Sequence, residues 1–158
     1  MWIDLLSMKK ILLLVLIAFS LNAQDAIIQT TKGAVSGTLN PKTNIQKFLG
    51  IPFAKPPVGE LRWKAPVPME SWSGIKEAKA FGPSPMQAKP APFAFWSSEF
   101  LIPESPISED CLYLNVWAPK SSKNKKAVLV YIYGGGFRSG GAACPIYDGE
   151  NMAQKDIV

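Results

Sequence analysis

The sequence predicts an α/β fold, of which these 158 residues form the N-terminal, strand-rich portion of an incomplete domain. Residues 112–117 alternate between apolar and more polar side chains, which predicts a strand with one apolar face. Residues 127–133 (AVLVYIY) are apolar throughout and predict a strand buried on both faces in the middle of a sheet. A central strand needs neighbours on both edges and helices over both faces. The residues after Ile132 are too few to supply them, so we expect the front part of a larger domain.

The first 23 residues have the pattern of a secretory signal peptide. Met8, Lys9 and Lys10 form a short basic patch, and residues 11–21 are apolar except for Ser20. This run is too short to span a membrane, which needs about 20 apolar residues; a buried N-terminal helix is the alternative. We expect export to the periplasm or the outside, and translation starts at either Met1 or Met8. Residues 24–158 are then the folded part.

Several shorter elements precede the two main strands. Residues 26–31 are β-prone, and Gly33 and Gly37 on either side of Val35 predict a hairpin turn and a return strand. Residues 48–53 form a compact apolar run that Pro56 and Pro57 end. Many prolines predict that residues 55–108 are largely irregular, with one short helix. Residues 155–158 look like the start of a further strand.

Composition excludes several functions. The chain has no histidine, so a Ser-His-Asp or Cys-His catalytic set cannot be complete within it. Two cysteines without histidine are too few for a structural zinc site, and we expect no metal and no cofactor. The net charge of +5 is mild and the lysines are scattered apart from a loop at 120–126. A nucleic-acid partner would need a basic face with interleaved aromatic residues, so none is expected.

Three consecutive glycines, Gly134, Gly135 and Gly136, directly follow the apolar run. They leave backbone N–H groups that no side chain covers. A tight turn is one explanation. A phosphate-binding loop is another, but neither G-x-x-x-x-G-K-[ST] nor G-x-G-x-x-G matches here. The third is an oxyanion hole like the HGGG-type loop of esterases, with Tyr133 in place of the histidine.

Four segments then resemble the type B carboxylesterase family, which includes the cholinesterases. FLGIPFAKPPVGELRW (48–63) is similar to the family pattern FxGIPYAxPPxGxLRF. SEDCLYLNV (108–116) is similar to a family signature of the same letters. YGGGF (133–137) resembles the oxyanion loop, and YDG (147–149) resembles the segment that follows it. The four come in family order and spacing, so residues 24–158 resemble the N-terminal part of a type B carboxylesterase domain.

The resemblance implies an α/β-hydrolase fold and hydrolysis of a small-molecule ester by a nucleophilic serine, without a cofactor. It implies that the amides of Gly135 and Gly136 are oxyanion donors, with a third donor after the nucleophile. No serine of this chain lies in a G-x-S-x-G elbow, so the nucleophile, the acid and the histidine are absent from it.

The resemblance also implies structural roles. Arg62 and Glu109 match a family pair, and we expect a partly buried ion pair between them; two unrelated surface charges are the alternative. Cys111 lacks the partner cysteine that relatives often have, so we expect a free, buried thiol. Leu101 occupies the place where cholinesterases have a choline-binding tryptophan. A neutral or bulky apolar acyl ester is therefore expected rather than a choline ester.

Three functional interpretations follow. The first is the opening part of an exported carboxylesterase, inactive alone but contributing the oxyanion loop. The second is a non-catalytic cholinesterase-like binding or adhesion module, which would not need an oxyanion hole. The third is an inactive truncated relic, whose unpaired central strand would expose an edge and favour aggregation.

Overall fold

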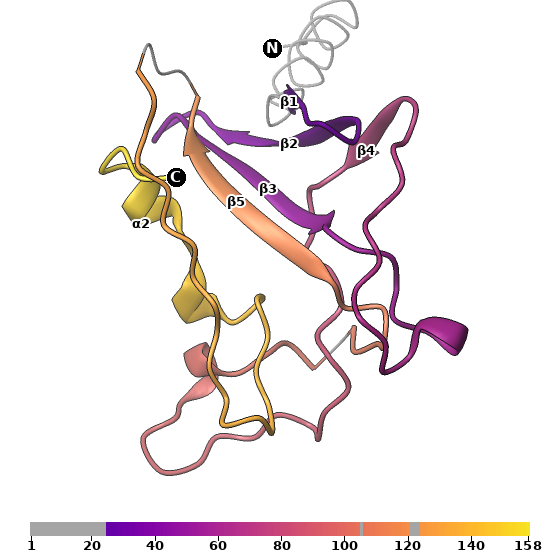
Figure 1. Ribbon diagram of the computed structural model, residues 1–158. Coiled ribbons are helices and arrows are strands. Elements are labelled where there is room, and N and C mark those ends of the chain that lie inside the picture. Colours follow the sequence, from indigo (N-terminus) through magenta and orange to yellow (C-terminus); the bar gives the residue numbers. More distant parts are fainter. Residues whose placement is uncertain (1–24, 105, 121–123) are drawn as a thin grey trace, which may run out of the picture.

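The computed structural model describes residues 25–104, 106–120 and 124–158, so the expected signal peptide lies outside the described residues. Five strands form one sheet: β1 (Asp25–Gln29), β2 (Ala34–Asn40), β3 (Ile45–Pro52), β4 (Ile75–Glu77) and β5 (Tyr113–Pro119). Their order is β1-β2-β3-β5, and β4 pairs in parallel with the first half of β2 (Figure 1). The described residues contain no helix long and apolar enough to cross a membrane.

The predicted N-terminal hairpin is confirmed. β1 and β2 pair antiparallel, with Ile28 opposite Val35. At the turn, the Thr30 hydroxyl donates to the Gly33 carbonyl at 2.8 Å and accepts from the Gly33 N–H at 3.2 Å. This local hydrogen bonding by a threonine side chain is typical of tight turns. Val35 points into the small core formed with Ala26, Phe48 and Ala78.

The predicted strand at 112–117 is confirmed as β5, which pairs antiparallel with β3. The pairing shifts register between Phe48 and Ile51, so the intervening residues form a bulge. Gly50 in the bulge has φ +72°, a conformation that glycine adopts without strain. The bulge frees backbone N–H groups from the ladder: Leu49 donates to the Ala78 carbonyl, and Gly50 donates to a side chain described below.

The proline-rich stretch is largely irregular, as expected. Two single 3₁₀ turns lie within it, η1 (Gly59–Leu61) and η2 (Ser98–Phe100), together with the short strand β4. Trp72 holds this stretch to the sheet, since its indole Nε1–H donates to the Ala34 carbonyl at 2.9 Å.

The prediction that residues 127–133 form a strand buried on both faces is wrong for this structure. Val128 to Ile132 are between 55% and 85% exposed. Ala127 forms one parallel bridge with Ile157, flanked by hydrogen bonds from Leu129 N to Val158 O and from Val158 N to Ala127 O. Among the described residues only 157–158 form backbone pairs with this segment, so its other edge is unpaired, and the Tyr131 ring, 4.9 Å from that of Tyr147, is one of its few side-chain contacts. The expected start of a strand at 155–158 is present as this bridge.

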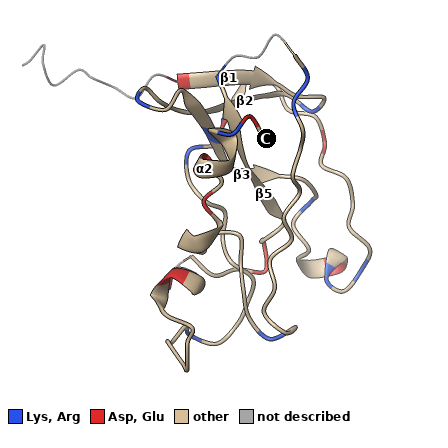
Figure 2. Cartoon of the chain, turned by 90° about the vertical axis from the view of Figure 1, so that its left-hand side faces the viewer, with Lys and Arg blue, Asp and Glu red and all other residues tan. Residues whose placement is uncertain are grey.

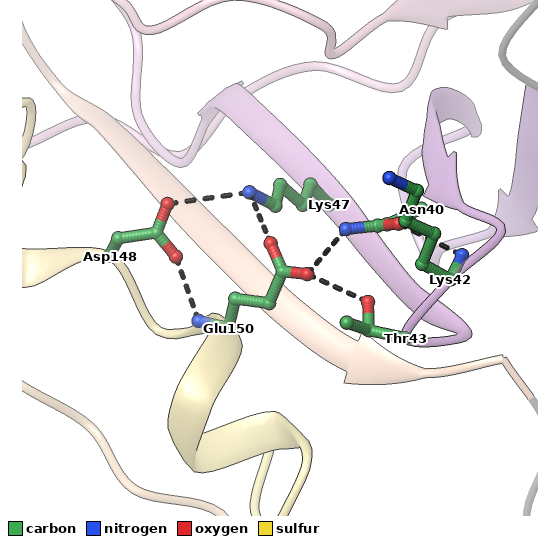
Figure 3. A network of polar contacts seen from close by, with 6 residues as sticks. All are labelled: Asn40, Lys42, Thr43, Lys47, Asp148 and Glu150. Atoms are coloured by element: carbon green, nitrogen blue, oxygen red, sulfur yellow. Dashed lines mark hydrogen bonds and ion pairs between the residues drawn. The ribbon is translucent and has the colours of Figure 1, made fainter.

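A network of polar contacts docks the C-terminal helix α2 (Glu150–Ala153) onto the β2–β3 hairpin (Figure 3). The Glu150 carboxylate accepts from Asn40 Nδ2 at 2.6 Å and Thr43 Oγ1 at 2.7 Å, and pairs with Lys47 Nζ at 2.6 Å. Lys47 also reaches Asp148 at 3.3 Å. The Asp148 side chain accepts from the Glu150 N–H at 2.8 Å, a local bond typical of a turn at aspartate, just before the helix.

Candidate active-site loop

The glycine-rich loop spans residues 134–140 and turns back on itself. Gly135 has φ +132° and Gly136 has φ +60°, and Phe137 continues in the left-handed region with φ 59°. The Gly135 carbonyl accepts from the N–H groups of Arg138 (3.1 Å) and Ser139 (3.2 Å). A Cβ at Gly135 would overlap the Ser139 carbonyl, so the turn requires glycine there.

The amide N–H groups of Gly135 and Gly136 donate no hydrogen bond to any described residue, and both glycines are exposed. A Cβ at Gly136 would meet nothing within 4 Å, so the space beside that residue is open. Adjacent amides of this kind can bind an anion or a developing oxyanion, because no side chain competes for the position in front of them.

The base of the loop is held by Gln87, which the sequence reasoning missed. Its Nε2 donates to the Gly140 carbonyl at 2.8 Å and to the Pro85 carbonyl at 3.0 Å. Its Oε1 accepts from the Gly140 N–H at 2.9 Å. One carboxamide therefore satisfies both backbone groups of Gly140. In sequence, Gln87 is one polar residue among prolines, and nothing local indicates a partner 53 positions away.

Asn115, in the signature of β5, holds the next residues of the same segment. Its Nδ2 donates to the Ala142 carbonyl at 3.1 Å, and its Oδ1 accepts from the Gly50 N–H at 2.9 Å. The side chain thereby joins the β3 bulge to the chain that leaves the glycine-rich loop. The signal that could have found it was a carboxamide in an otherwise apolar strand.

The chain that leaves the loop is buried at Ala143 and Cys144, and Ile102 is buried as well. Gly141 packs against Ile102 and Ser84: a Cβ there would come within 2.7 Å of Ile102 Cγ2 and 2.9 Å of Ser84 Oγ. Burial raises the pKa of the Cys144 thiol above its ordinary value. The pKa of Tyr133, the residue before the glycines, is also raised, first by burial and then by the two nearby cysteines.

The chain's two cysteines are both free thiols. Cys111 is free as expected, but it is half-buried, so the expectation that it is buried is wrong, whereas Cys144 is buried. Cys111 lies just before β5, where the chain is irregular. Its pKa is raised, first by burial and then by the neighbouring carboxylates of Asp110 and Glu109.

Arg62 and Glu109 lie together, with Nη2 of the arginine 2.5 Å from Oε2 of the glutamate. Their side chains are 51% and 41% exposed, so water screens the pair. The pair joins the η1 turn to the segment before β5. It thus links the first two of the four motif segments but does not contact the glycine-rich loop.

Charged groups show no concentration at the loop. Figure 2 shows Lys and Arg at separate strand ends and loops of the described chain, and several lie within 4.0 Å of a carboxylate, including Lys47, Lys55, Lys79 and Lys126. The described residues also contain no group of three or more His, Cys, Asp or Glu side chains able to hold a metal ion. The distinctive chemistry of the site is therefore its backbone amides.

The sheet, the β3 bulge and the glycine-rich loop that follows residues 127–133 are the strand-rich part of an α/β-hydrolase fold. The carboxylesterase family model matches residues 24–158. The chain belongs to this family.

Individual relatives give the extent of the match. The chain is 42% identical over 138 residues to a cholinesterase of Mus musculus, covering 85% of this chain and 23% of the relative. It is 42% identical over 133 residues to a fumonisin B1 esterase of Sphingopyxis macrogoltabida, covering 82% and 22%. A solved PNB esterase superposes with a TM-score of 0.73 at 38% identity, covering 85% of this chain and 26% of that structure. The chain thus spans about a quarter of the length of these relatives.

Proposed function

We propose that this chain supplies the oxyanion-binding part of an exported serine carboxylic ester hydrolase. The observation that carries the proposal is the pair of exposed amides at Gly135 and Gly136, which have no partner among the described residues and lie on a loop anchored at its base. In acyl transfer from an ester, the carbonyl oxygen gains negative charge as the nucleophile attacks. Two N–H groups held in front of it stabilise that charge.

The remaining chemistry must come from other residues of the esterase, because this sequence has no histidine to act as proton shuttle. A serine hydroxyl attacks the ester carbon while a histidine takes its proton. The same histidine returns the proton to the leaving alkoxide, and water then releases the acid. In this scheme the loop binds the oxyanion in both tetrahedral intermediates.

A chimeric enzyme tests this function directly. Residues 24–158 would replace the matching segment of the fumonisin B1 esterase, which is 42% identical to them. We expect hydrolysis of p-nitrophenyl butyrate, and preference for it over butyrylthiocholine because Leu101 carries no aromatic face for a choline cation. Gly136→Pro removes one N–H donor, and proline cannot adopt the φ of +60° found at Gly136. It should lower kcat about 100- to 1,000-fold, as loss of one oxyanion donor does.

The matched control is Gly74→Pro, at a glycine with φ +73° whose Cβ would also meet nothing within 4 Å and which lies outside the loop. It should leave kcat within about threefold. An inactive chimera that folds normally, or equal losses from the two variants, would contradict the proposal and favour the binding-module interpretation. Reading the source DNA past codon 158 gives a second test, since a G-x-S-x-G elbow followed by a histidine is expected.

A further inference from the structure

We infer that Gln87 is a positioning residue for the glycine-rich loop: its carboxamide fixes Gly140 so that the amides of Gly135 and Gly136 keep one orientation. This rests on the proposed function of the loop. Gln87 uses both N–H groups of its amide and its carbonyl oxygen in three bonds of 2.8 to 3.0 Å. Two of the three go to Gly140, and the third goes to Pro85 in its own segment.

The orientation of the Gln87 amide follows from its partners. The Gly140 N–H can only donate, so the atom that it faces is the carbonyl oxygen of the side chain. The Gly140 and Pro85 carbonyls can only accept, so they face Nε2. Only one orientation of the amide satisfies all three partners. The side chain is therefore a rigid anchor and not a mobile surface group.

Gly140 lies against Gly134, the first residue of the loop, so its position affects the residues that follow Gly134. It has φ +119°, and a Cβ there would lie 2.5 Å from the Gly134 carbonyl and 3.0 Å from Cδ2 of Tyr133. The two ends of the loop, Gly134 and Gly140, are thus in direct contact. A displacement of Gly140 would shift Gly134, which is bonded to Gly135, the first proposed donor, and Gly136 follows directly. Oxyanion donors act within a few tenths of an ångström of their best distance, so such a movement lowers catalysis.

Asn115 does not duplicate this anchor. It holds the Ala142 carbonyl, two residues further along, and its other partner is the β3 bulge. It therefore fixes where the chain goes after the loop, whereas Gln87 fixes the residue that closes the loop. Among the described residues Gln87 is the one side chain that bonds to Gly140, so its loss leaves both backbone groups of Gly140 without a side-chain partner there.

Two variants and a control separate positioning from general stability. Gln87→Met keeps the length of the side chain and removes all three bonds. Gln87→Glu keeps an acceptor for the Gly140 N–H but places carboxylate oxygens against the two carbonyls. Gln154→Met is the matched control, because the exposed Gln154 side chain makes no hydrogen bond to a described residue. Amide hydrogen exchange would be followed by NMR on the full chain. The values of kcat and KM would be measured on the chimera.

In Gln87→Met we expect exchange of the Gly140 amide to quicken at least tenfold, with changed shifts at Gly135 and Gly136. In Gln87→Glu this amide should stay within about threefold of the parent, and in Gln154→Met it should not change. In the chimera, Gln87→Met should lower kcat at least tenfold while KM stays within twofold and the melting temperature is retained. An unchanged Gly140 exchange rate, or a rise in KM that accounts for the whole loss, would overturn the inference. If exchange responds as expected but the parent chimera has no esterase activity, the anchor stands and the proposed function fails.

Discussion

The polar network around Glu150 allows a quantitative test of how α2 is held to the sheet (Figure 3). The perturbation is Glu150→Gln. The parent carboxylate binds three groups on the β2–β3 hairpin, Asn40, Thr43 and Lys47, at 2.6 to 2.7 Å. The glutamine oxygen can keep the first two partners, but its NH₂ group then faces the Lys47 ammonium, which is also a donor. The substitution therefore removes one charge-assisted contact and leaves the shape of the side chain nearly unchanged.

The expected loss follows from burial and from the type of contact. A hydrogen bond to a charged partner contributes about 1.5–3 kcal/mol when it is well buried. Here the Glu150 and Lys47 side chains are 17% and 25% exposed, and Asp148 remains beside Lys47. Partial screening lowers the figure, and we expect about 1.5 kcal/mol for Glu150→Gln. Glu150→Ala loses the two neutral donors as well, at about 0.5–1.5 kcal/mol each, and should cost about 3 kcal/mol.

Urea unfolding of the full chain, followed by tryptophan fluorescence at low micromolar concentration, measures this loss. Trp117 is a suitable probe because it lies opposite Lys47 in the β3–β5 ladder and packs against Gly149, just before α2. The midpoint should fall while the slope stays constant. Glu60→Gln is the control, since the Glu60 side chain is fully exposed and 4.0 Å from its lysine. It should change stability by less than about 0.5 kcal/mol.

The pH dependence gives an independent check. Hydrogen bonds from Lys47, then from Thr43, hold the pKa of Glu150 below its ordinary value in the folded chain. Stability from a lowered carboxyl pKa is fully present above the unfolded pKa, about 4.3, and is lost as pH falls through the folded pKa. The difference between parent and Glu150→Gln should therefore be constant from pH 7 to about 5 and shrink below about 4. A difference under 0.5 kcal/mol at pH 7, or one that grows in acid, would refute the reasoning.

Three further predictions concern single sites. Gly37→Ala should cost more than about 2 kcal/mol in urea unfolding, because its Cβ would overlap the Lys47 carbonyl and lie 2.6 Å from the Phe48 ring. Glu109→Gln should cost only about 0–1 kcal/mol in the same assay, since the pair with its arginine is half exposed. Titration with a thiol reagent at pH 8 should modify Cys111 first and Cys144 only in urea, because Cys144 is 3% exposed.

The sequence alone predicts the parts of this fold that depend on local chemistry. The β1–β2 hairpin follows from its turn residues and β5 follows from alternation, and both are found. The bulge in β3 depends on which strand lies opposite, so no local pattern shows it. The same applies to α2, whose docking rests on a glutamate that reaches residues more than 100 positions away.

The candidate site likewise contains residues that the sequence predicts and residues that it does not. The run of three glycines was visible in the sequence, and two of them, Gly135 and Gly136, adopt positive φ angles that favour glycine. Gln87 and Asn115 were not visible in the sequence. Each carboxamide binds backbone groups of a distant segment, and residues of every type carry backbone groups, so the sequence of that segment does not mark the contact. Side-chain bonds to backbone leave no complementary residue to search for, whereas the Arg62–Glu109 pair was expected because both residues match a pair in the resembled family.

The segment 128–132 shows that an apolar sequence does not by itself establish burial. Its apolar residues predict a buried strand, but a strand is buried only where other residues pack against it. Among the described residues, Val130 and Ile132 are 79% and 85% exposed. An apolar segment with an open edge favours association between chains. The double variant Val130→Lys/Ile132→Lys should therefore raise the soluble fraction several-fold in a sedimentation assay at 50–100 µM, about the range where such edges associate.

The same variant should leave the unfolding midpoint nearly unchanged, because both residues are largely exposed in this structure and exposed substitutions cost less than about 0.5 kcal/mol. Val35→Lys is the contrasting case: Val35 is 2% exposed in the core beside Phe48, and a lysine there should prevent folding. If the double variant instead lowers the midpoint as Val35→Lys does, residues 130 and 132 are buried in solution. Equal sedimentation of the double variant and the parent would place the associating surface elsewhere, and the exposed aromatic residues Phe93 and Phe95 are the next to change.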